Sequence, residues 1–496
     1  MPRPFLPPLA RLTVLAAGAC GIALFVLQVA SAAPGDLDSS FGQRGVVALA
    51  GLGWSEANAV AILPNGELLV AGRAGEGNLL IARLRPDGQP DPTFGQNGIL
   101  SRSVGSGSVA YDAAVQADGA ILVAGSAGDD AFIARFHPNG DPDLSFGDAG
   151  VVRRRWGSPA RAKRLAVQPD GKIVMVGDSS EATGSQVLVA RFLPNGAPDV
   201  AFGTDGAFQS ALGRQFAYGF DLALLPDGRI VAAGSAIVRL TPTGTLDLAF
   251  GQNGVVAEPA SGIVAQPDGT AIVVNSGGGV RRLTPAGVVD QQFGNGGGVT
   301  ATLPGTAISF QDVAFEPDGR IVAVGFAVER SGRSSALLAA LTPAGMFDTK
   351  VGSSGIVTHG LGAASANANG VAIQPDGKAA VAAAIGGAAD RQAVVVRFDL
   401  GVTPATTPTL PASQQATGTP SSTAPPLPSP TPTLMVAATP SPTAPAPSAA
   451  PSFTASASPT AAAATATPTA TGSPRAADPT ATPGTVSPTP PRRAAP

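Results

Sequence analysis

Cysteine and histidine are almost absent from this sequence. It contains one cysteine, Cys20, and two histidines, His137 and His359. Because Cys20 lies in the N-terminal segment, a mature chain without that segment has no disulfide and no thiolate metal site. Two histidines also leave little for His-based catalysis or a His-rich metal centre. We therefore expect neither a metal nor a cofactor.

Charged residues are scarce as well, at 13% of 496 residues, and the net charge is only -3. Such a balance gives no overall field that would direct the chain to nucleic acid or to a membrane surface. The sequence also lacks a G-x-S-x-G elbow, a metal-ligand spacing and a nucleotide-binding glycine loop. These absences predict that the protein is not an enzyme. The 63 glycines and 47 prolines instead indicate many turns.

Residues 1–32 have the pattern of a secretory signal peptide. Arg3 and Arg11 precede an apolar run from Leu12 to Ala30, and Ala30-Ser31-Ala32 fits a small-x-small cleavage site. We expect a secreted, extracellular or envelope-associated protein with no stable membrane span after cleavage. Two alternatives are a retained membrane anchor and a lipid-modified Cys20.

What the sequence does contain is a repeat of about 52 residues. Each copy has a turn followed by an apolar run, as in LPNGELLVAG or QPDGKIVMVG, and a Phe-Gly segment, as in PDPTFGQNG or PDLSFGDAG. Four short runs can be distinguished in a copy, here named a to d; in the first copy they are Ala59–Leu63, Glu67–Gly72, Leu79–Arg85 and Phe94–Leu100. Run b is apolar on both faces, so it must be covered on both. Seven copies predict an all-β, seven-bladed β-propeller of four-stranded blades over residues 33–401.

The order of the runs predicts how the ring closes. The chain opens with a d run, 36–47, and ends with a c run, 393–400, so the two together complete one blade. The N-terminal strand should therefore pair with the last strand, which removes two exposed sheet edges. Arg397 should then meet Asp38.

These motifs resemble the delta-60 repeat family, a bacterial β-propeller family of largely unknown function. The resemblance covers residues 36–400 and rests on the LD-x-x-FG-x-x-G and PDG-x-I-x-x-AG segments. It implies the propeller fold and no activity.

Residues 402–496 are rich in Pro, Thr, Ala and Ser and hold four charges. Such sequence cannot bury a core, and we expect a disordered tail that acts as a spacer.

Arginine at the end of run c and aspartate at the start of run d recur eight residues apart. A structural ion pair across the c–d hairpin is the natural interpretation. The sixth copy departs from this pattern, with Ala340 in place of Arg and Val351 in place of Phe. Asp348 should then lack its partner, and the sixth blade should be the weakest. The pairs are Arg83/Asp91, Arg135/Asp143, Arg191/Asp199, Arg239/Asp247 and Arg282/Asp290.

Acidic residues offer two further sites. Asp141, Asp143 and Asp148 suggest either turn chemistry or a calcium loop, and the turn is favoured because Asp caps such turns. Carboxylates near the start of run a are expected as separate, solvated or capping groups, or as a hydrolytic set round the channel mouth. They are Glu56, Asp112, Asp221 and Asp312.

The b–c loops and d–a connectors vary between copies and share one face, whereas the a–b and c–d turns hardly vary. Variable loops on a uniform scaffold are common recognition sites, and Tyr, Trp and Arg are frequent in binding hot spots. A basic run also falls here, which includes Arg161, Lys163 and Arg164. The candidate binding residues on this variable-loop face are Trp54, Tyr111, Arg153, Arg154, Arg155, Trp156, Tyr218 and His359.

We therefore expect a monomeric secreted or cell-surface module that binds an unknown protein or polysaccharide through the variable-loop face. The alternatives are an envelope lyase or hydrolase with its site at the channel mouth, and a structural spacer-and-head protein.

Overall fold

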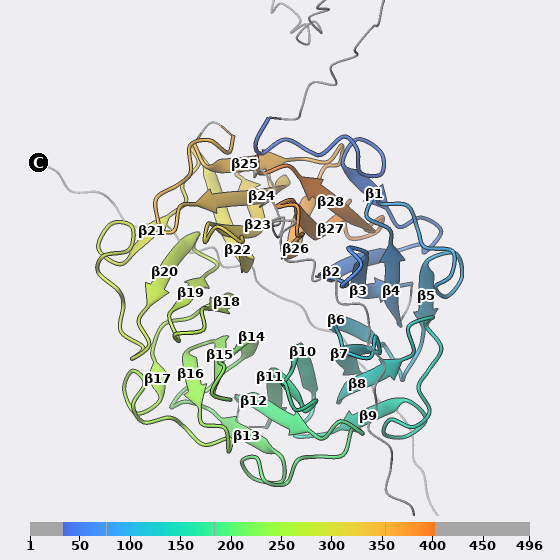
Figure 1. The fold of residues 1–496 in the computed structure, drawn as a ribbon, viewed down its shortest axis with the longest axis vertical. Helices are drawn as coiled ribbons and strands as arrows, with labels where there is room; N and C mark the ends of the chain where they lie inside the picture. Colours follow the sequence, from blue (N-terminus) through green and yellow to red (C-terminus); the bar gives the residue numbers. More distant parts are fainter. Residues whose placement is uncertain (1–32, 76, 183, 353, 402–496) are drawn as a thin grey trace, which may run out of the picture. The chain divides into compact units, whose positions relative to one another are not determined.

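A computed structural model describes residues 33–401, apart from positions 76, 183 and 353, as seven four-stranded antiparallel sheets. The sheets stand round a central channel as the blades of a propeller (Figure 1). The predicted fold is thereby confirmed. The predicted signal peptide and tail lie outside the described residues and stay predictions. In the described part, no helix is long and apolar enough to cross a membrane.

Strand a of each blade lies at the channel, and strands b, c and d follow outward (Figure 1). Blades 1 to 3 consist of β2 (Ser55–Ile62), β3 (Leu68–Ala74), β4 (Asn78–Leu84) and β5 (Ile99–Arg102); β6 (Val109–Val115), β7 (Ile121–Ala127), β8 (Asp130–Phe136) and β9 (Val151–Arg154); and β10 (Ala160–Val167), β11 (Ile173–Glu181), β12 (Gly184–Phe192) and β13 (Ala207–Ser210).

Blades 4 to 6 consist of β14 (Gly219–Leu224), β15 (Ile230–Gly234), β16 (Ile237–Leu240) and β17 (Val255–Val256); β18 (Gly262–Ala265), β19 (Ala271–Val274), β20 (Gly279–Leu283) and β21 (Gly298–Thr300); and β22 (Thr306–Phe315), β23 (Ile321–Glu329), β24 (Ser334–Leu341) and β25 (Ile356–His359). Blade 7 joins β26 (Ala366–Ile373), β27 (Ala379–Ile385) and β28 (Gln392–Phe398) to β1 (Val46–Ala48).

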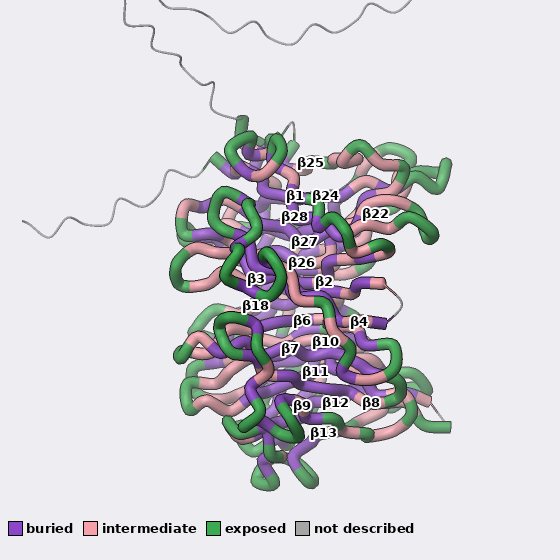
Figure 2. The backbone as a smooth tube through the Cα atoms, turned by 90° about the vertical axis from the view of Figure 1, so that its right-hand side faces the viewer, coloured by how far each residue is buried: buried purple, intermediate pink, exposed green. Residues whose placement is uncertain are grey.

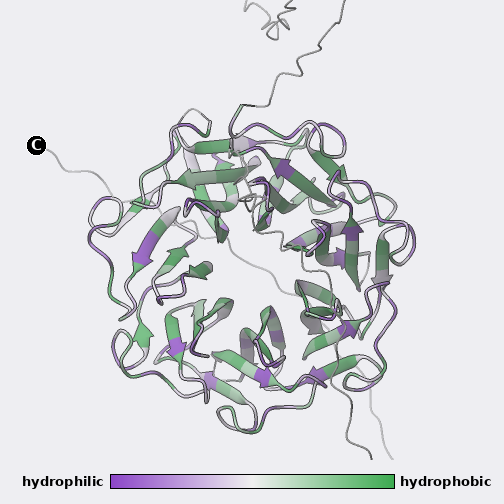
Figure 3. Cartoon of the chain, viewed as in Figure 1, coloured by the Kyte–Doolittle hydropathy of each residue, from purple (hydrophilic) through white to green (hydrophobic). Residues whose placement is uncertain are grey.

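The hydrophobic core lies between the blades. Alternate residues of β3 point to opposite neighbours: Leu68 and Val70 pack toward blade 7, whereas Leu69 and Ala71 pack toward blade 2. This explains why run b is apolar on both faces. Buried residues fill the middle layer and exposed residues lie in the loops of both faces (Figure 2), and the strands form the most hydrophobic part of each blade (Figure 3).

The outermost strand begins later than the sequence suggested. In the first blade it spans Ile99–Arg102, and the predicted Phe94–Leu100 run is mostly a turn. Gly95 and Asn97 have φ of 52°, which is left-handed backbone that an extended strand does not contain. Phe94 is fully buried in this turn. The Phe-Gly segment therefore packs against the next blade and does not lengthen the strand.

The ring closes as predicted. Val46, Val47 and Ala48 pair with Val396, Val395 and Val394, so β1 is the outer strand of blade 7. Arg397 Nε donates to Asp38 at 2.8 Å. The first described residues thus complete the last blade.

The recurrent arginine joins three partners at once. In blade 1, Arg83 Nε donates to Asp91 at 2.6 Å, Nη1 donates to the Pro138 carbonyl of blade 2 at 2.5 Å, and the guanidinium lies 5.0 Å from the Phe94 ring centre. A planar guanidinium suits this combination of fork-shaped hydrogen bonding and stacking. The predicted ion pairs are therefore confirmed, and they are also links between blades. The other arginines that donate to a carbonyl of the next blade are Arg135, Arg191, Arg239, Arg282 and Arg397.

The glycine of each Phe-Gly pair adds a second link. Gly95 N donates to the Asn139 carbonyl of the next blade, and Gly140 of that blade approaches the Phe94 ring so closely that a Cβ there would meet it at 3.1 Å. Equivalent amide bonds occur at every junction, at 2.8–3.1 Å. At the sixth junction Gly352 N donates to Pro34 O, so the chain start contributes here too.

Blade 6 corrects one prediction. Asp348 does not lack a cation, because Arg320 Nη1 lies 3.2 Å from its carboxylate and 3.3 Å from the Leu400 carbonyl of blade 7. Arg320 also donates to the buried Glu316 at 2.5 Å. An arginine from the start of strand b therefore replaces the one missing from strand c.

The acidic turn of blade 2 is built by local hydrogen bonds. Asp143 Oδ1 accepts from both N and Oγ of Ser145, and its Oδ2 accepts from Arg135 Nε. These bonds support turn chemistry for this segment.

Deleting residues 33–48 tests the closure. The deletion removes β1, Asp38 and the fully buried Phe41, so we expect a loss of at least about 3–5 kcal/mol in unfolding free energy, the cost of a buried Phe alone. The exposed edge of β28 should also promote aggregation. Denaturant unfolding with light scattering measures both, and Phe41→Ala serves as the partial control. A deletion protein that unfolds at the parent's midpoint contradicts this closure.

Arg320→Ala and Arg229→Ala form a matched pair. Both arginines follow an Asp-Gly turn and reach the aspartate of strand d, but Asp247 keeps Arg239 when Arg229 is removed. We expect Arg320→Ala to cost about 2–4 kcal/mol because two buried carboxylates lose their cation. Arg229→Ala should cost under about 1 kcal/mol. Equal losses in chemical denaturation contradict the replacement of Ala340 by Arg320.

Candidate functional site

A β-bulge interrupts strand a in six of the seven blades. In blade 2 the register shifts between Ala110 and Asp112, so Tyr111 is the extra residue. A bulge re-aims side chains where a regular strand would alternate them. Two successive residues of each inner strand are thereby available to the channel. The bulge residues are Asn58, Tyr111, Lys163, Phe220, Gln311 and Asn369.

These six residues, with Ser261 of blade 5, line one cavity of about 510 Å³ at the mouth of the channel. The volume lies within the usual range of ligand sites, about 300–1,000 Å³. Loop residues complete its wall on the side of blades 4 and 5, on the variable-loop face. They are Gly234, Ser235, Pro259, Ala260, Asn275 and Ser276.

Blades 4 and 5 form a low wall. Their strands β15, β16, β19 and β20 have four or five residues each, whereas β11 and β12 of blade 3 have nine. Because longer b and c strands extend the blade toward the variable-loop face, the cavity is shallowest over blades 4 and 5. Phe220, exposed by 40%, lies on this side, whereas Phe216, exposed by 53%, pairs with Ser185 of blade 3.

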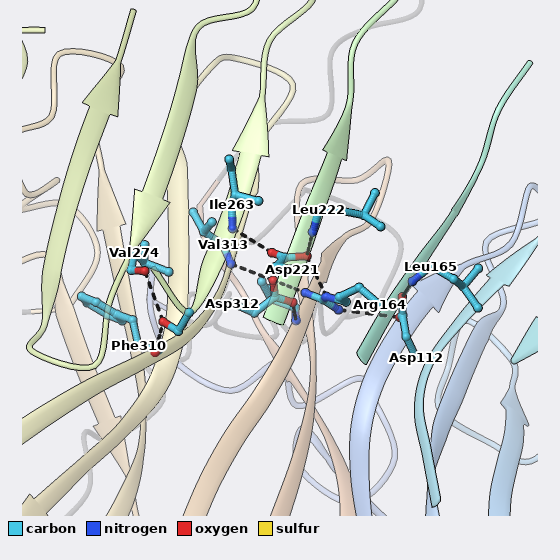
Figure 4. Close-up of polar contacts among 12 residues, drawn as sticks. Asp112, Arg164, Leu165, Asp221, Leu222, Ile263, Val274, Phe310, Asp312 and Val313 are labelled. Carbon is cyan, nitrogen blue, oxygen red and sulfur yellow. Dashed lines mark hydrogen bonds and ion pairs between the residues drawn. The ribbon is translucent and has the colours of Figure 1, made fainter. Parts of the chain in front are cut away.

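The floor of the cavity is a single arginine. Arg164, on β10, extends its guanidinium toward three aspartates from three other inner strands (Figure 4). Its Nε donates to Asp221 at 2.9 Å, its Nη2 donates to Asp312, and its Nη1 lies 3.7 Å from Asp112. The three aspartates line a smaller cavity of about 250 Å³ beneath Arg164. Arg164 borders both cavities and so separates them.

The aspartates also hold neighbouring blades together. Each accepts a main-chain N–H from the next blade: Leu165 N donates to Asp112 at 2.9 Å, Ile263 N to Asp221 at 2.7 Å, and Val371 N to Asp312 at 2.9 Å. These carboxylates are 4–7% exposed. These three carboxylates are neither separate nor solvated, whereas the capping role that was predicted with those properties agrees with their main-chain hydrogen bonds. Glu56 remains apart from them and pairs with Arg391 at 3.3 Å.

Burial governs the protonation of this cluster. It raises the pKa of Asp112 to about 6, against the opposing effect of Arg164. It also raises the pKa of Asp221, with Asp312 adding repulsion. The pKa of Arg164 lies well above its ordinary value because the three carboxylates outweigh its burial. The site therefore favours the protonated forms of Asp112 and Asp221 more than water does.

The predicted binding residues do not gather at one place. Tyr111 lines the cavity, with the Lys163 ammonium 3.6 Å from its ring centre. Tyr218 lies directly behind, stacked on Phe220 with ring centres 6.3 Å apart. Trp54, directly before β2, instead binds the loop between β27 and β28, because its indole N–H donates to the Ala388 carbonyl at 2.8 Å.

The remaining five lie on outer strands or their connectors. Arg153 and Arg154 belong to β9. Trp156 packs against Phe192 in a T-shaped arrangement with the ring centres 6.2 Å apart. Arg155 pairs with Asp130 at 2.8 Å. His359 ends β25, accepts a hydrogen bond from Leu361 N at 2.9 Å, and has its pKa lowered by burial.

The residues of the predicted basic run also lie in different parts of the structure. Arg161, Lys163 and Arg164 lie on strand β10, not in a connector. Lys163 faces the cavity mouth, and Arg164 forms its floor. The cavity residues that sequence reasoning missed share the bulge position of strand a; they are Asn58, Phe220, Gln311 and Asn369. Aligning the seven a runs could have revealed that position, but no sequence signal marks the bulge that turns it inward.

Comparison with known proteins supports the repeat assignment. A family model described as a domain of unknown function (DUF5122) β-propeller matches residues 63–94, 116–146, 168–202 and 225–250. Each match extends from the a–b turn to the Phe-Gly segment, and together they span less than half the chain. No curated protein matches the chain.

Several solved structures are similar to the chain. A catalytically inactive virginiamycin B lyase from Staphylococcus aureus with quinupristin has a TM-score of 0.45 and 14% identity, covering 71% of this chain and 98% of that one. The WD40 β-propeller domain of Doa1 has a TM-score of 0.44 and 12% identity, covering 71% and 97%. A chain of a mitotic checkpoint complex has a TM-score of 0.46 and 11% identity, covering 78% and 99%.

Asp112→Asn tests the protonation of the cluster. Because the folded pKa of about 6 exceeds the ordinary aspartate value of 3.8, the folded chain keeps a proton that the unfolded chain loses as pH rises from 4 to 6. The parent should therefore lose on the order of 2 kcal/mol relative to the variant over this interval. Denaturant unfolding at several pH values measures the difference. Parallel profiles for the two proteins contradict the raised pKa.

Proposed function

We propose that this propeller is a secreted or cell-surface binding module that recognises a protein or glycan through its variable-loop face, with the contact centred on the channel mouth. The main support for this proposal is that one side chain from each of the seven blades lines a single cavity of about 510 Å³. These seven positions differ in chemistry, whereas the links between blades repeat. Such a division between scaffold and variable positions is typical of recognition sites.

The predicted signal segment and the Pro/Thr/Ala/Ser-rich segment 402–496 support an extracellular role for this head. The match to the DUF5122 β-propeller repeats is compatible with the resemblance to the delta-60 repeat family. That family assignment remains part of this proposal.

A hydrolase or lyase is the second candidate, and one observation favours it. Asp112 and Asp221 are buried in the channel with raised pKa values, and a carboxyl whose pKa lies at about 6, as for Asp112, can take part in general acid–base catalysis. Their hydrogen bonds favour a structural role instead, because Asp221 and Asp312 give both oxygens to Arg164 and to main-chain amides. Binding without catalysis is therefore the better-supported function.

Phe220→Ala and Lys163→Ala test the proposal. Both residues line the cavity, and neither belongs to the links between blades. A glycan array and a pull-down with the parent should give a ligand whose binding falls about tenfold or more in each variant. Arg153→Ala, on the outer strand β9, is the control and should bind as the parent.

Three outcomes contradict the proposal. Binding that is equal in the parent and both cavity variants places recognition elsewhere on the propeller. Turnover of a captured ligand by the parent that disappears in Asp312→Asn supports the enzyme, and no binding to any probe supports a structural spacer-and-head protein.

A further inference from the structure

We propose that the channel-mouth cavity binds an acidic saccharide, a sugar ring that carries a carboxylate. This inference rests on the proposed binding function and names its ligand class. It follows from the arrangement of cations, amides and one exposed aromatic ring round the cavity.

The charges that face the cavity are positive. Lys163 and Arg164 line it, and no aspartate or glutamate among the described residues does. Lys163 lies over the Tyr111 ring and has no ion-pair partner within the described part of the chain. Arg164 donates from Nε to Asp221 and from Nη2 to Asp312. Its Nη1 is 3.7 Å from Asp112, which is too far for a hydrogen bond. The charge of Arg164 is already balanced by three carboxylates, so the cation that remains for a ligand carboxylate is Lys163.

Asp221 and Asp312, beneath Arg164, do not present free oxygens to this ligand, because Arg164 and main-chain amides occupy both oxygens of each. A main-chain amide of the next blade also occupies one oxygen of Asp112, and Arg164 lies between the two cavities. The cluster therefore holds Arg164 in place and leaves the upper surface to the guanidinium.

The cavity wall has two chemically different halves. Blades 2 to 4 contribute Tyr111, Lys163 and Phe220, whereas blades 5, 6, 7 and 1 contribute Ser261, Gln311, Asn369 and Asn58. The Asn58 and Asn369 Nδ2 atoms donate across the blade junctions to Ala110 and Ala57 carbonyls, at 2.8 Å in each case. These bonds fix the amide planes, and each amide oxygen remains as an acceptor for a hydroxyl group.

The other half offers a surface for the apolar face of a sugar ring. Phe220 is 40% exposed, and Tyr218 stacks on it with an interplanar angle of 18°. A supported aromatic ring opposite fixed amides and beside a cation complements a molecule with hydroxyls on its edge, C–H groups on its face and one negative charge. Asp178 lies close enough to interact with Lys163, but a neutral sugar would leave the ammonium without an ion pair in the cavity. A simple anion would leave the amide half unused.

The test uses the full secreted chain and matched ligands. Oligomers of galacturonate, glucuronate and mannuronate are titrated calorimetrically beside the same oligomers after their carboxyl groups are reduced to alcohols. We expect at least one acidic oligomer to bind at least about tenfold more tightly than its reduced form. Lys163→Gln should abolish this preference, and Lys163→Arg should restore most of it. Phe220→Ala should weaken acidic and reduced forms alike, and Arg153→Gln should change neither.

The outcomes separate the inference from the proposed function. Equal binding of acidic and reduced forms, or a preference that survives in Lys163→Gln, overturns the acidic-saccharide inference. So does the failure of all acidic oligomers while another glycan or a protein binds in a Phe220-dependent manner, and in that case the proposed function stands. If nothing binds in a Phe220-dependent manner, both fail. Thermal melting of each variant checks that it is folded.

Discussion

The guanidinium between neighbouring blades is the interaction on which the ring depends. Apolar packing attracts blades to each other but does not set their angle, because it has no direction. The arginine of strand c supplies that direction: it bonds an aspartate of its own blade, stacks on a phenylalanine and reaches a carbonyl of the next blade. Blade 6 shows how strictly the link is kept, since Arg320 makes it from another strand when position 340 is alanine.

The channel follows a different rule from the junctions. A bulge in six of the seven blades exposes one residue of the inner strand to the mouth, and these residues range from lysine to phenylalanine to asparagine. Some of the cavity residues also contribute to the junctions, because Asn58, Ser261 and Asn369 donate to carbonyls of the next blade. The next residue inward has a mixed role, since Asp112, Asp221 and Asp312 hold adjacent blades and also balance Arg164. Two successive positions of strand a thus serve different purposes: the first lines the cavity and the second holds adjacent blades together.

Local patterns predicted the ring, its closure and the Arg–Asp pairs, because each depends on residues at a constant spacing in every copy. They failed where contacts join distant copies. The convergence of Asp112, Asp221 and Asp312 on Arg164 needs four inner strands to face one axis, and nothing near any one of them signals it. Arg320 was missed for the same reason: its partners Asp348 and Leu400 lie in other elements. The bulge that aims Lys163 and Phe220 inward breaks the alternation on which strand predictions depend.

The pairing of β1 with β28 has a consequence for the time course of folding. Asp38 and Arg397 are 359 residues apart in the chain, the longest separation of any ion pair in the described part. A chain made from its N-terminus emerges with β1 unable to pair until all seven blades have been produced. The strand that is synthesised first, β1, is thus the last to pair. Forming such a distant contact is slow. Until it forms, the nascent propeller has two open sheet edges. The interval between synthesis and closure is therefore when this protein most needs protection from self-association.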